Sequence, residues 1–235
     1  DISIKPIADK IFKAIKHNME IEDPTFENVQ AWSRKYLELS MAAENGAMDL
    51  GTGDLSEGAL GWCTMFADHS SHFNPNAGVP KTLVTYLILW AADKIFENEP
   101  KVQKTLRDIV DTPISPELKR PGKDGQIEHK TEDIVGPYEL VDFYMYYFVR
   151  FGYSPTLIAR LALQAFEGRP GRDLVTIKKF LKVFITRFFA NQYKRNCVPD
   201  GVKLGLTSLS PRGDWRMPSD AEVFIWLKDV DSIPV

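Results

Sequence analysis

The sequence GTGDLSE, residues 51–57, separates a short apolar segment (47–50) from an amphipathic segment (55–64). We interpret this order as a strand, a glycine-rich turn and the start of a helix. In α/β proteins such a turn holds nucleotides, because glycines let the backbone approach the ligand and the N–H groups at the helix N-terminus attract anions. Glu57 would lie on the first helical turn, where its carboxylate suits a divalent metal or a ribose hydroxyl. Taken alone, this stretch fits an ordinary capped turn better.

The composition limits the classes of protein to which the chain can belong. Of its 235 residues, 44% are apolar and 26% are charged, which is ordinary for a soluble globular protein. The net charge of −3 argues against a surface for nucleic acids or anionic membranes, because both attract excess Lys and Arg. The longest apolar run, residues 83–92, is shorter than the ~20 residues that span a bilayer. With two cysteines, Cys63 and Cys197, and no leader resembling a signal peptide, the sequence predicts a reducing, cytoplasmic location.

The spacing of apolar residues predicts a chain built mostly of helices. The expected helices cover residues 7–20, 26–45, 55–64, 81–97, 138–151, 154–166, 174–195 and 221–227. Apolar residues are spaced for one face in the first two, and Ser154 and Asp173 are start signals for two of the others. Residues 47–50 are the expected strand, and residues 65–80 are expected to form a polar loop. Residues 111–137, rich in proline, glycine and charge, are expected to form a long loop. Because residues 1–7 alternate like the end of a strand, we also expect further residues upstream.

Four longer strings resemble the signatures of one enzyme family. They are GTGDLSEGALGWCT (51–64), ENVQA (27–31), NPNAGVPKTL (74–83) and SLSPRGDWRMPSD (208–220). Together they resemble the NAD synthetases, and the last string resembles the ending of the long, glutamine-dependent type. The motifs are in the family's order, and the resemblance covers nearly the whole chain.

This resemblance implies an α/β fold of the Rossmann type found in ATP pyrophosphatases (adenine nucleotide α-hydrolase-like). Residues 1–235 would form a helix-rich C-terminal portion of the synthetase domain. In the family, ATP adenylates the carboxylate of deamido-NAD, and ammonia then attacks the acyl adenylate. The implied cofactors are ATP and Mg²⁺, which balances charge on the phosphates. In the glutamine-dependent type an amidase domain supplies the ammonia, and a homo-oligomer is expected because the deamido-NAD site lies near a subunit interface.

The resemblance also assigns roles to individual residues. The implied contacts to ATP are Thr52, Lys81 and Ser115, and Lys81 would reach a phosphate as a point charge. The implied contacts to deamido-NAD come from separate segments of the chain: Asn28, Glu57, Trp62, Cys63, Thr64, Met65 and Lys194. Glu57 is in addition the implied magnesium ligand.

Several of these residues have structural interpretations as well. Lys81 could be a solvated lysine at a helix start, although its place in the string VPKT favours a functional role. For Lys194, a charge that stabilises a helix C-terminus is as good an explanation as ligand binding. Asn is a poor helix former, so Asn28 within the segment 26–45 favours a function. Trp62 fits a core position as well as a stacking platform.

Other features give weaker or opposing signals. His69 and His72 lack a third metal ligand at matching spacing, and Cys63 has no His base in its sequence context. Neither a pyrophosphate-binding loop of the type SGGxxS nor the amidase domain is present in residues 1–235. We therefore expect that this polypeptide alone does not synthesise NAD. Turnover by the purified chain with ammonia, ATP and deamido-NAD would contradict that expectation.

Two alternatives stay open. The first is another amidating pyrophosphatase of the same fold, for example one acting on a purine nucleotide, and the strings WCT (62–64) and SPRGDW (210–215) argue against it. The second is a non-catalytic or divergent nucleotide-binding module.

Overall fold

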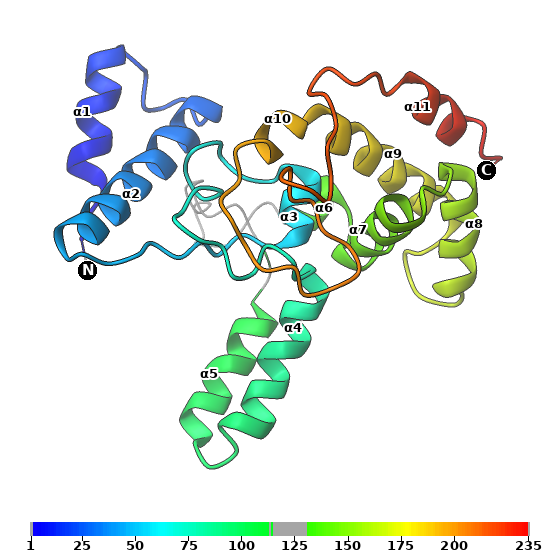
Figure 1. The fold of residues 1–235 in the computed structure, drawn as a ribbon, viewed down its shortest axis with the longest axis horizontal. Helices are drawn as coiled ribbons and strands as arrows, with labels where there is room; N and C mark the ends of the chain where they lie inside the picture. Colours follow the sequence, from blue (N-terminus) through cyan, green and yellow to red (C-terminus); the bar gives the residue numbers. More distant parts are fainter. Residues whose placement is uncertain (1, 113, 115–130, 235) are drawn as a thin grey trace.

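The computed structural model describes residues 2–112, 114 and 131–234 (Figure 1). Its helices are α1 (Lys5–Ile15), α2 (Pro24–Glu44), α3 (Leu55–Leu60), α4 (Lys81–Trp90), α5 (Pro100–Asp111), α6 (Thr131–Val135), α7 (Tyr138–Met145), α8 (Pro155–Ala165), α9 (Leu174–Ala190), α10 (Gln192–Arg195) and α11 (Phe224–Asp231). π-Helical turns continue α4 and α7, as η1 (Ala91–Ile95) and η2 (Tyr146–Arg150). No helix among the described residues is long and apolar enough to cross a membrane.

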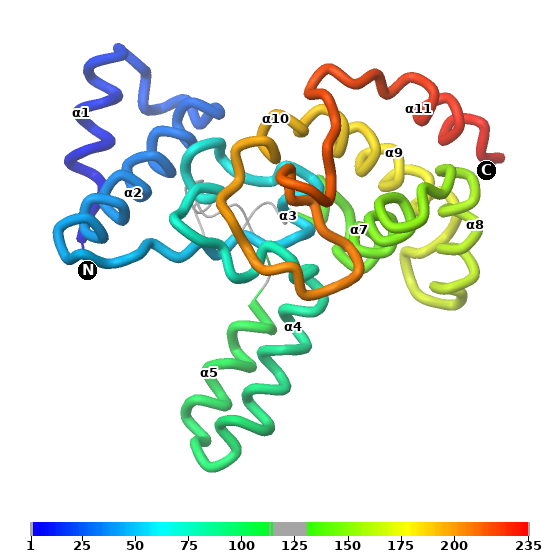
Figure 2. Tube along the Cα trace, viewed as in Figure 1, coloured from blue at the N-terminus to red at the C-terminus, as the bar shows by residue number. Residues whose placement is uncertain are grey.

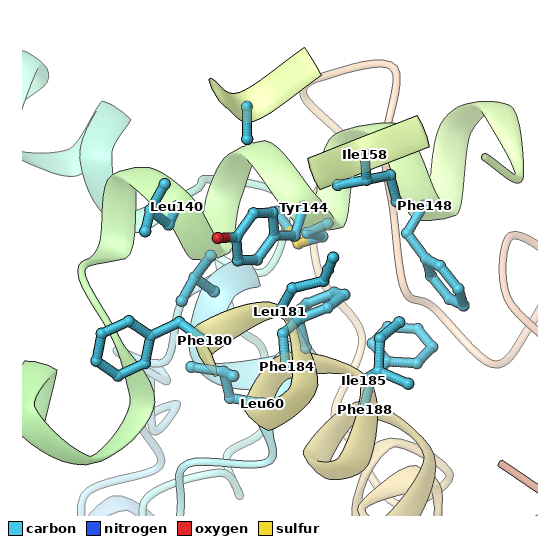
Figure 3. Close-up of a cluster of buried hydrophobic side chains, with 14 of the residues drawn as sticks. Leu60, Leu140, Tyr144, Phe148, Ile158, Phe180, Leu181, Phe184, Ile185 and Phe188 are labelled. Atoms are coloured by element: carbon cyan, nitrogen blue, oxygen red, sulfur yellow. The ribbon is translucent and has the colours of Figure 1, made fainter. Parts of the chain in front are cut away.

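The main hydrophobic core lies between α7, α8, α9 and α11, and Figure 3 shows its centre. The ring of Tyr144, on α7, packs 6.0 Å from that of Phe184, and its hydroxyl donates to the carbonyl oxygen of Ile177 at 3.1 Å. Leu60 of α3 is also fully buried in this core, which anchors the short helix. The fully buried residues of α9 share one face of the helix: Ile177, Leu181, Phe184, Ile185 and Phe188.

Two pairs of helices extend from this core (Figure 2). In α1 and α2, Phe12 and Phe26 stack with ring centres 5.6 Å apart and form a separate small cluster. The α4–α5 hairpin projects away from the rest of the chain, and neither helix contains a buried residue. Several large apolar side chains of α4 are exposed: Leu83, Tyr86, Leu87 and Trp90. The hairpin therefore presents an apolar surface outside the core.

Most of the predicted helices are confirmed, with changes at their ends. The predicted helix 55–64 ends already at Leu60, because Gly61 has a left-handed backbone with φ 59°. The predicted helix 7–20 ends at Ile15, and Lys16 there has φ 56°. The predicted helix 174–195 is interrupted at Asn191, between α9 and α10.

Three other expectations need correction. The predicted strand 47–50 is wrong, because only Leu50 forms a bridge, a parallel one to Phe73. Extended pairing among the described residues is limited to this bridge and one between Asn74 and Gly201, and stable sheets need longer ladders. Helix α5 was not predicted, and α6 lies within the predicted loop 111–137. The rest of that loop, residues 113 and 115–130 with the predicted ATP contact Ser115, is outside the described residues.

Candidate functional site

The N-terminal end of α3 is held by a reciprocal pair of hydrogen bonds. Asp54 is the N-cap residue, and its Oδ1 accepts a hydrogen bond from the backbone N–H of Glu57 at 2.9 Å. Glu57 Oε2 in turn accepts one from the backbone N–H of Asp54 at 3.1 Å. This capping box satisfies two N–H groups that the start of α3 would otherwise leave unpaired, and it fixes both carboxylates.

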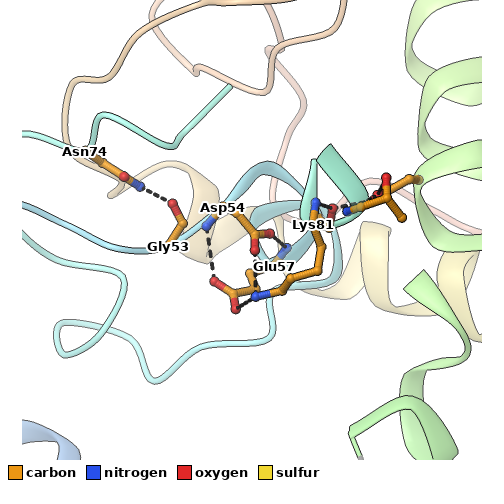
Figure 4. A network of polar contacts seen from close by, with 8 residues as sticks. Gly53, Asp54, Glu57, Asn74 and Lys81 are labelled. Atoms are coloured by element: carbon orange, nitrogen blue, oxygen red, sulfur yellow. Dashed lines mark hydrogen bonds and ion pairs between the residues drawn. The ribbon is translucent and has the colours of Figure 1, made fainter. Parts of the chain in front are cut away.

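The ammonium group of Lys81 lies between these two carboxylates (Figure 4). Its Nζ is 2.7 Å from Asp54 Oδ2 and 2.7 Å from Glu57 Oε1. Burial is the main cause that raises the pKa of both carboxyl groups, and the charge of Lys81 opposes it. Burial lowers the pKa of Lys81, but the two carboxylates outweigh burial and the net shift is upward. The two carboxyl groups thus share one cationic group of the chain itself, the ammonium of Lys81.

The glycine-rich turn before α3 packs closely against the loop 65–80. Asn74 Nδ2 donates to the carbonyl oxygen of Gly53 at 2.8 Å, as Figure 4 shows. A Cβ atom on Gly51 would lie 2.6 Å from Ser71 Oγ, so any other residue here would force the Ser71 side chain to move. Between the two glycines, the predicted ATP contact Thr52 is exposed. The tight packing involves the two glycines and does not cover the side chain of Thr52.

The C-terminal end of α3 is covered by side chains from α9 and α10. Arg195 is only 1% exposed, and its guanidinium donates to the carbonyl oxygens of Gly58 and Ala59 at 3.3 and 3.0 Å. Burial lowers the pKa of this guanidinium to about 10. The carbonyl groups offset part of that cost, because the C-terminal end of a helix carries partial negative charge.

Three further side chains complete this cover. Arg187 Nε and Asn191 Nδ2 donate to the last carbonyl oxygen of α3, at 3.2 and 3.1 Å. Lys194 Nζ donates to the carbonyl oxygens of Gly61 and Cys63 at 2.9 and 2.7 Å. These bonds engage two of the three N–H groups of the ammonium and place the predicted substrate contact Lys194 on the 61–63 turn.

The segment after α3 is joined to α2 by side-chain hydrogen bonds. Thr64 Oγ1 donates to Asn28 Oδ1 at 3.1 Å, which brings together two predicted substrate contacts. The carbonyl oxygen of Met65, a third, accepts a hydrogen bond from the indole N–H of Trp32 at 2.8 Å. The structure thus places Asn28 beside the 62–65 stretch, although α2 and α3 are separate elements.

Trp62 and Cys63 are both half-buried. The guanidinium carbon of Arg187 lies 4.9 Å from the centre of the Trp62 ring, in a cation–π contact. Burial raises the pKa of the Cys63 thiol to about 12, although the positive charge of Lys194 acts in the opposite direction. The thiol is therefore protonated at neutral pH, and only the thiolate is a good nucleophile.

A pocket of about 160 Å³ lies beside α3. Three of the predicted residues line it: Glu57, Cys63 and Lys194. Asp54 lines it as well, so Asp54 and Glu57 connect the pocket to Lys81. One wall comes from the segment after α10, for which no ligand contact was predicted: Gly201, Val202, Lys203, Ser208, Ser210 and Asp214. Lys203 and Asp214 form an ion pair on this wall.

The two histidines of the loop 65–80 support its turns. His69 Nδ1 accepts a hydrogen bond from the backbone N–H of Phe66 at 3.0 Å, and His72 Nδ1 accepts one from that of Asp49 at 2.9 Å. Over the described ranges, no group of three or more His, Cys, Asp or Glu side chains is placed to hold a metal ion. A metal at Glu57 would therefore need ligands beyond the described residues.

Sequence reasoning missed several residues of this site. Arg195 follows Lys194 in the string QYKR (192–195), which is the one available signal. Arg187 and Asn191 are ordinary positions of a predicted helix. Asp142 accepts hydrogen bonds from Ser56 and Thr82, and no motif marks it. These contacts join positions far apart in the chain, which periodicity does not reveal.

Comparisons with known proteins give this arrangement a context. The family model "NAD synthase" matches residues 1–165. A glutamine-dependent NAD(+) synthetase from Mycobacterium tuberculosis is 41% identical over 229 residues, which cover 90% of this chain and 33% of that protein. Another, from Mycobacterium leprae, is 40% identical over 253 residues and covers 98% of this chain and 37% of that protein. The crystal structure of a glutamine-dependent NAD(+) synthetase from Cytophaga hutchinsonii aligns with a TM-score of 0.72 at 21% identity, over 97% of this chain and 34% of that one.

The structural likeness defines the class of fold: the helices of this chain have the fold of part of a glutamine-dependent NAD(+) synthetase. Because the family model covers more than half of the residues, the chain belongs to the NAD synthase family. The family predicted from the four strings is thus confirmed. The chain spans about a third of the length of the curated relatives that it matches.

Proposed function

We propose that this chain carries ATP- and substrate-binding surface of a glutamine-dependent NAD synthetase, which amidates deamido-NAD with the use of ATP. The observation that carries this proposal is the gathering of distant segments around one short helix. Asn28, the stretch 51–65, Lys81 and Lys194 meet at α3. A helix this short is not stable on its own, so the contacts at both of its ends define its position.

The acidic end of α3 supports binding of a magnesium nucleotide. Asp54 Oδ2 and Glu57 Oε1 converge on one cation, the Lys81 ammonium. Mg²⁺ is commonly held by one or two carboxylates together with phosphate oxygens and waters, so these two side chains are the ones that would hold it. The ion would balance charge on the phosphates of ATP. Lys81 is next to this point and would place its charge on a phosphate oxygen.

The cationic end of α3 supports binding of the acceptor substrate. Lys194 and Cys63 line the pocket, and Trp62 offers an aromatic ring held by Arg187. Deamido-NAD carries a carboxylate and an aromatic pyridine ring, and these two features suit a lysine ammonium and a tryptophan ring. We assign the pocket to this substrate. Thr64, the residue after Cys63, and its hydrogen-bond partner Asn28 would contact the substrate outside the lining of the pocket.

The proposed reaction has two steps. A carboxylate oxygen of deamido-NAD attacks the α-phosphorus of ATP, the bond to pyrophosphate breaks, and an acyl adenylate forms. Ammonia then attacks the acyl carbon, nitrogen loses a proton, and AMP departs to leave the amide of NAD. In the whole protein an amidase domain would release the ammonia from glutamine. The part of this chain is to bind and orient the two nucleotides, in a fold that we infer to be of the ATP-pyrophosphatase type.

Association of chains is a separate part of the proposal. The exposed side chains of Leu83, Tyr86, Leu87 and Trp90 support a homo-oligomer, because large apolar patches on a protein surface commonly mark contact sites. Analytical ultracentrifugation would test it: a single monomer species at high micromolar concentration contradicts this part without affecting the assignment of the site.

Calorimetric titration with deamido-NAD, with and without Mg-ATP, tests the proposed function. We expect saturable binding that Glu57→Ala weakens about tenfold or more, because a charged hydrogen-bonding group is lost. Glu44→Ala is the matched control, since Glu44 is exposed at the end of α2. If a folded sample binds neither nucleotide, the chain by itself does not form the site. The alternative of a divergent, non-catalytic module would then be tested in the full-length protein.

A further inference from the structure

The N-terminus of α4 is capped by residues from two other helices. Its own N-cap residue is Pro80, which has no side-chain acceptor. The first N–H groups of a helix have no partner within it, and Ser, Thr, Asp or Asn usually satisfies them from the N-cap position. Here the N–H of Lys81 donates to Ser56 Oγ of α3 at 2.8 Å. The N–H of Thr82 donates to Asp142 Oδ2 of α7 at 3.0 Å.

Asp142 connects all three helices at this point. Its Oδ2 accepts a second hydrogen bond, from Thr82 Oγ1 at 2.6 Å, and its Oδ1 accepts one from Ser56 Oγ. Burial raises the pKa of the Asp142 carboxyl, while the hydrogen bonds from Ser56 and Thr82 oppose that rise. A carboxylate at a helix N-terminus also interacts favourably with the helix dipole. One side chain thus fixes the start of α4 against α3 and α7.

This cap fixes the backbone that carries Lys81. Lys81 is the first residue of α4, so the bonds to Ser56 and Asp142 hold its Cα near the N-terminal end of α3. From there its ammonium reaches both Asp54 and Glu57 at 2.7 Å. A long lysine side chain loses conformational entropy when it forms such a contact. Because the backbone of Lys81 is already fixed, less entropy is lost when the contact forms.

We propose that Asp142 is a positioning residue for the site: through Ser56 and the N-terminus of α4, it sets where the Lys81 ammonium lies. Asp142 acts through these neighbours, to which both of its carboxylate oxygens are bonded. The consequence for nucleotide binding rests on the proposed function, in which Lys81 contacts a phosphate of ATP. The placement of Lys81 itself does not rest on it.

NMR of the folded protein separates positioning from general stability. In Asp142→Ala we expect the amide protons of Lys81 and Thr82 to exchange about tenfold faster or more, because their acceptors are lost or free to move. In ¹⁵N-lysine-labelled protein, the ammonium signal of Lys81 should weaken or shift as its contact with Asp54 and Glu57 loosens. Asp93→Ala is the control, since it breaks an exposed pair with Arg107 on the same hairpin. It should leave both readouts unchanged.

Conservative variants keep the test decisive if Asp142→Ala does not fold. Asp142→Asn keeps an acceptor for Thr82 and should restore its amide protection at least in part. Ser56→Ala removes the acceptor of the Lys81 amide, and faster exchange is expected there. Wild-type exchange at Lys81 together with a wild-type ammonium signal, in folded Asp142→Ala or in folded Ser56→Ala, overturns the proposal.

Nucleotide binding gives a second readout that distinguishes the two proposals. If the wild-type protein binds Mg-ATP, Asp142→Ala should weaken binding about tenfold, and it should have little further effect in a Lys81→Met background. Equal losses in both backgrounds contradict action through Lys81. If the wild type binds no ATP but the NMR changes occur, the ATP role of Lys81 fails and the positioning role stands.

Discussion

The two ends of α3 are stabilised in opposite ways. At the N-terminal end, Asp54 and Glu57 lie close in sequence and form a capping box within one helical turn. At the C-terminal end, the carbonyl groups are covered by cationic and amide side chains from more than 100 residues later in the chain: Arg187, Asn191, Lys194 and Arg195. Both patterns match the helix dipole, with negative charge at the start and positive charge at the end. One end depends on local sequence and the other on the tertiary fold.

This contrast shows how a six-residue helix can organise the proposed binding site. Such a helix is too short to be stable in isolation, so it exists only where its ends are fixed. Fixing the acidic end holds Asp54 and Glu57 around the Lys81 ammonium. Fixing the cationic end places Lys194 at the wall of the pocket and Arg187 over the Trp62 ring. Perturbing each end separately should therefore give different results, with the larger effects at the buried cationic end.

The largest expected effect concerns the reactivity of Cys63, which follows the cationic end. Its pKa of about 12, against an ordinary value of 9.0, reduces the thiolate fraction at pH 8 about a thousandfold. Cys197 is exposed and serves as an internal reference. In folded protein we expect iodoacetamide to label Cys197 at least a hundredfold faster than Cys63, as measured by mass spectrometry of the peptides. In urea the two labelling rates should become similar. Equal rates in the folded protein would contradict the claim that burial raises the pKa of the Cys63 thiol.

The next largest effect is expected for Arg195→Met, which keeps the apolar stem but removes every donor. The carbonyl oxygens of Gly58, Ala59 and Phe188 then lose a buried partner. We expect the free energy of unfolding to fall by about 3 kcal/mol, since buried acceptors without partners are costly. Urea denaturation measures this change. Arg160→Met, at an exposed position on α8, is the control and should change stability by less than about 0.5 kcal/mol.

The contrast between the ends also explains what could be predicted from the sequence. The start of α3 was predicted because its signals are local: two glycines, then Asp54 with Glu57 three residues later. The end of α3 was misplaced by four residues, at 64 instead of Leu60, although Gly61 is a standard stop signal. The strand 47–50 failed because an extended segment depends on partners that periodicity does not supply.

The candidate site divides in the same way. The family resemblance identified Asn28, Glu57, Lys81 and Lys194, and the structure brings each to α3 or the segment after it. Their predicted ligands stay predictions. The residues that hold these side chains in place were not predicted, because Asp142 and Arg195 act across large sequence separations. Motifs mark the groups for which ligand contacts are predicted, whereas the contacts that support them depend on the packing of α7 and α9.

A smaller effect is expected from Asp54→Ala at the acidic end. Loss of an N-cap side chain typically costs about 1 kcal/mol of stability. The accompanying loss of the Lys81 contact should add little, because burial of Asp54 already raises its pKa and so offsets part of the gain. Asp23→Ala is the matched comparison, since Asp23 caps α2 in the same manner without a lysine between carboxylates. Similar losses in the two variants, seen by urea denaturation, would agree with this account. A loss above about 3 kcal/mol in Asp54→Ala alone would contradict it.

The smallest expected effect is a change in the pH dependence of stability. Asp54 and Glu57 have pKa values raised above 3.8 and 4.5, so they bind more protons in the folded state than in the unfolded state. Unfolding then releases protons, and the stability contributed by these groups is present at low pH and lost as pH rises through the folded pKa values. Asp54→Asn combined with Glu57→Gln keeps both capping acceptors and removes both titrations. In buffer with a metal chelator, the stability of wild type minus that of the double variant should therefore decrease from pH 4.5 to pH 7.5. A difference that grows with pH would mean that attraction to Lys81 outweighs burial, so that the folded state favours the ionised carboxylates. Charge would then stabilise both ends of α3, negative at the start and positive at the end.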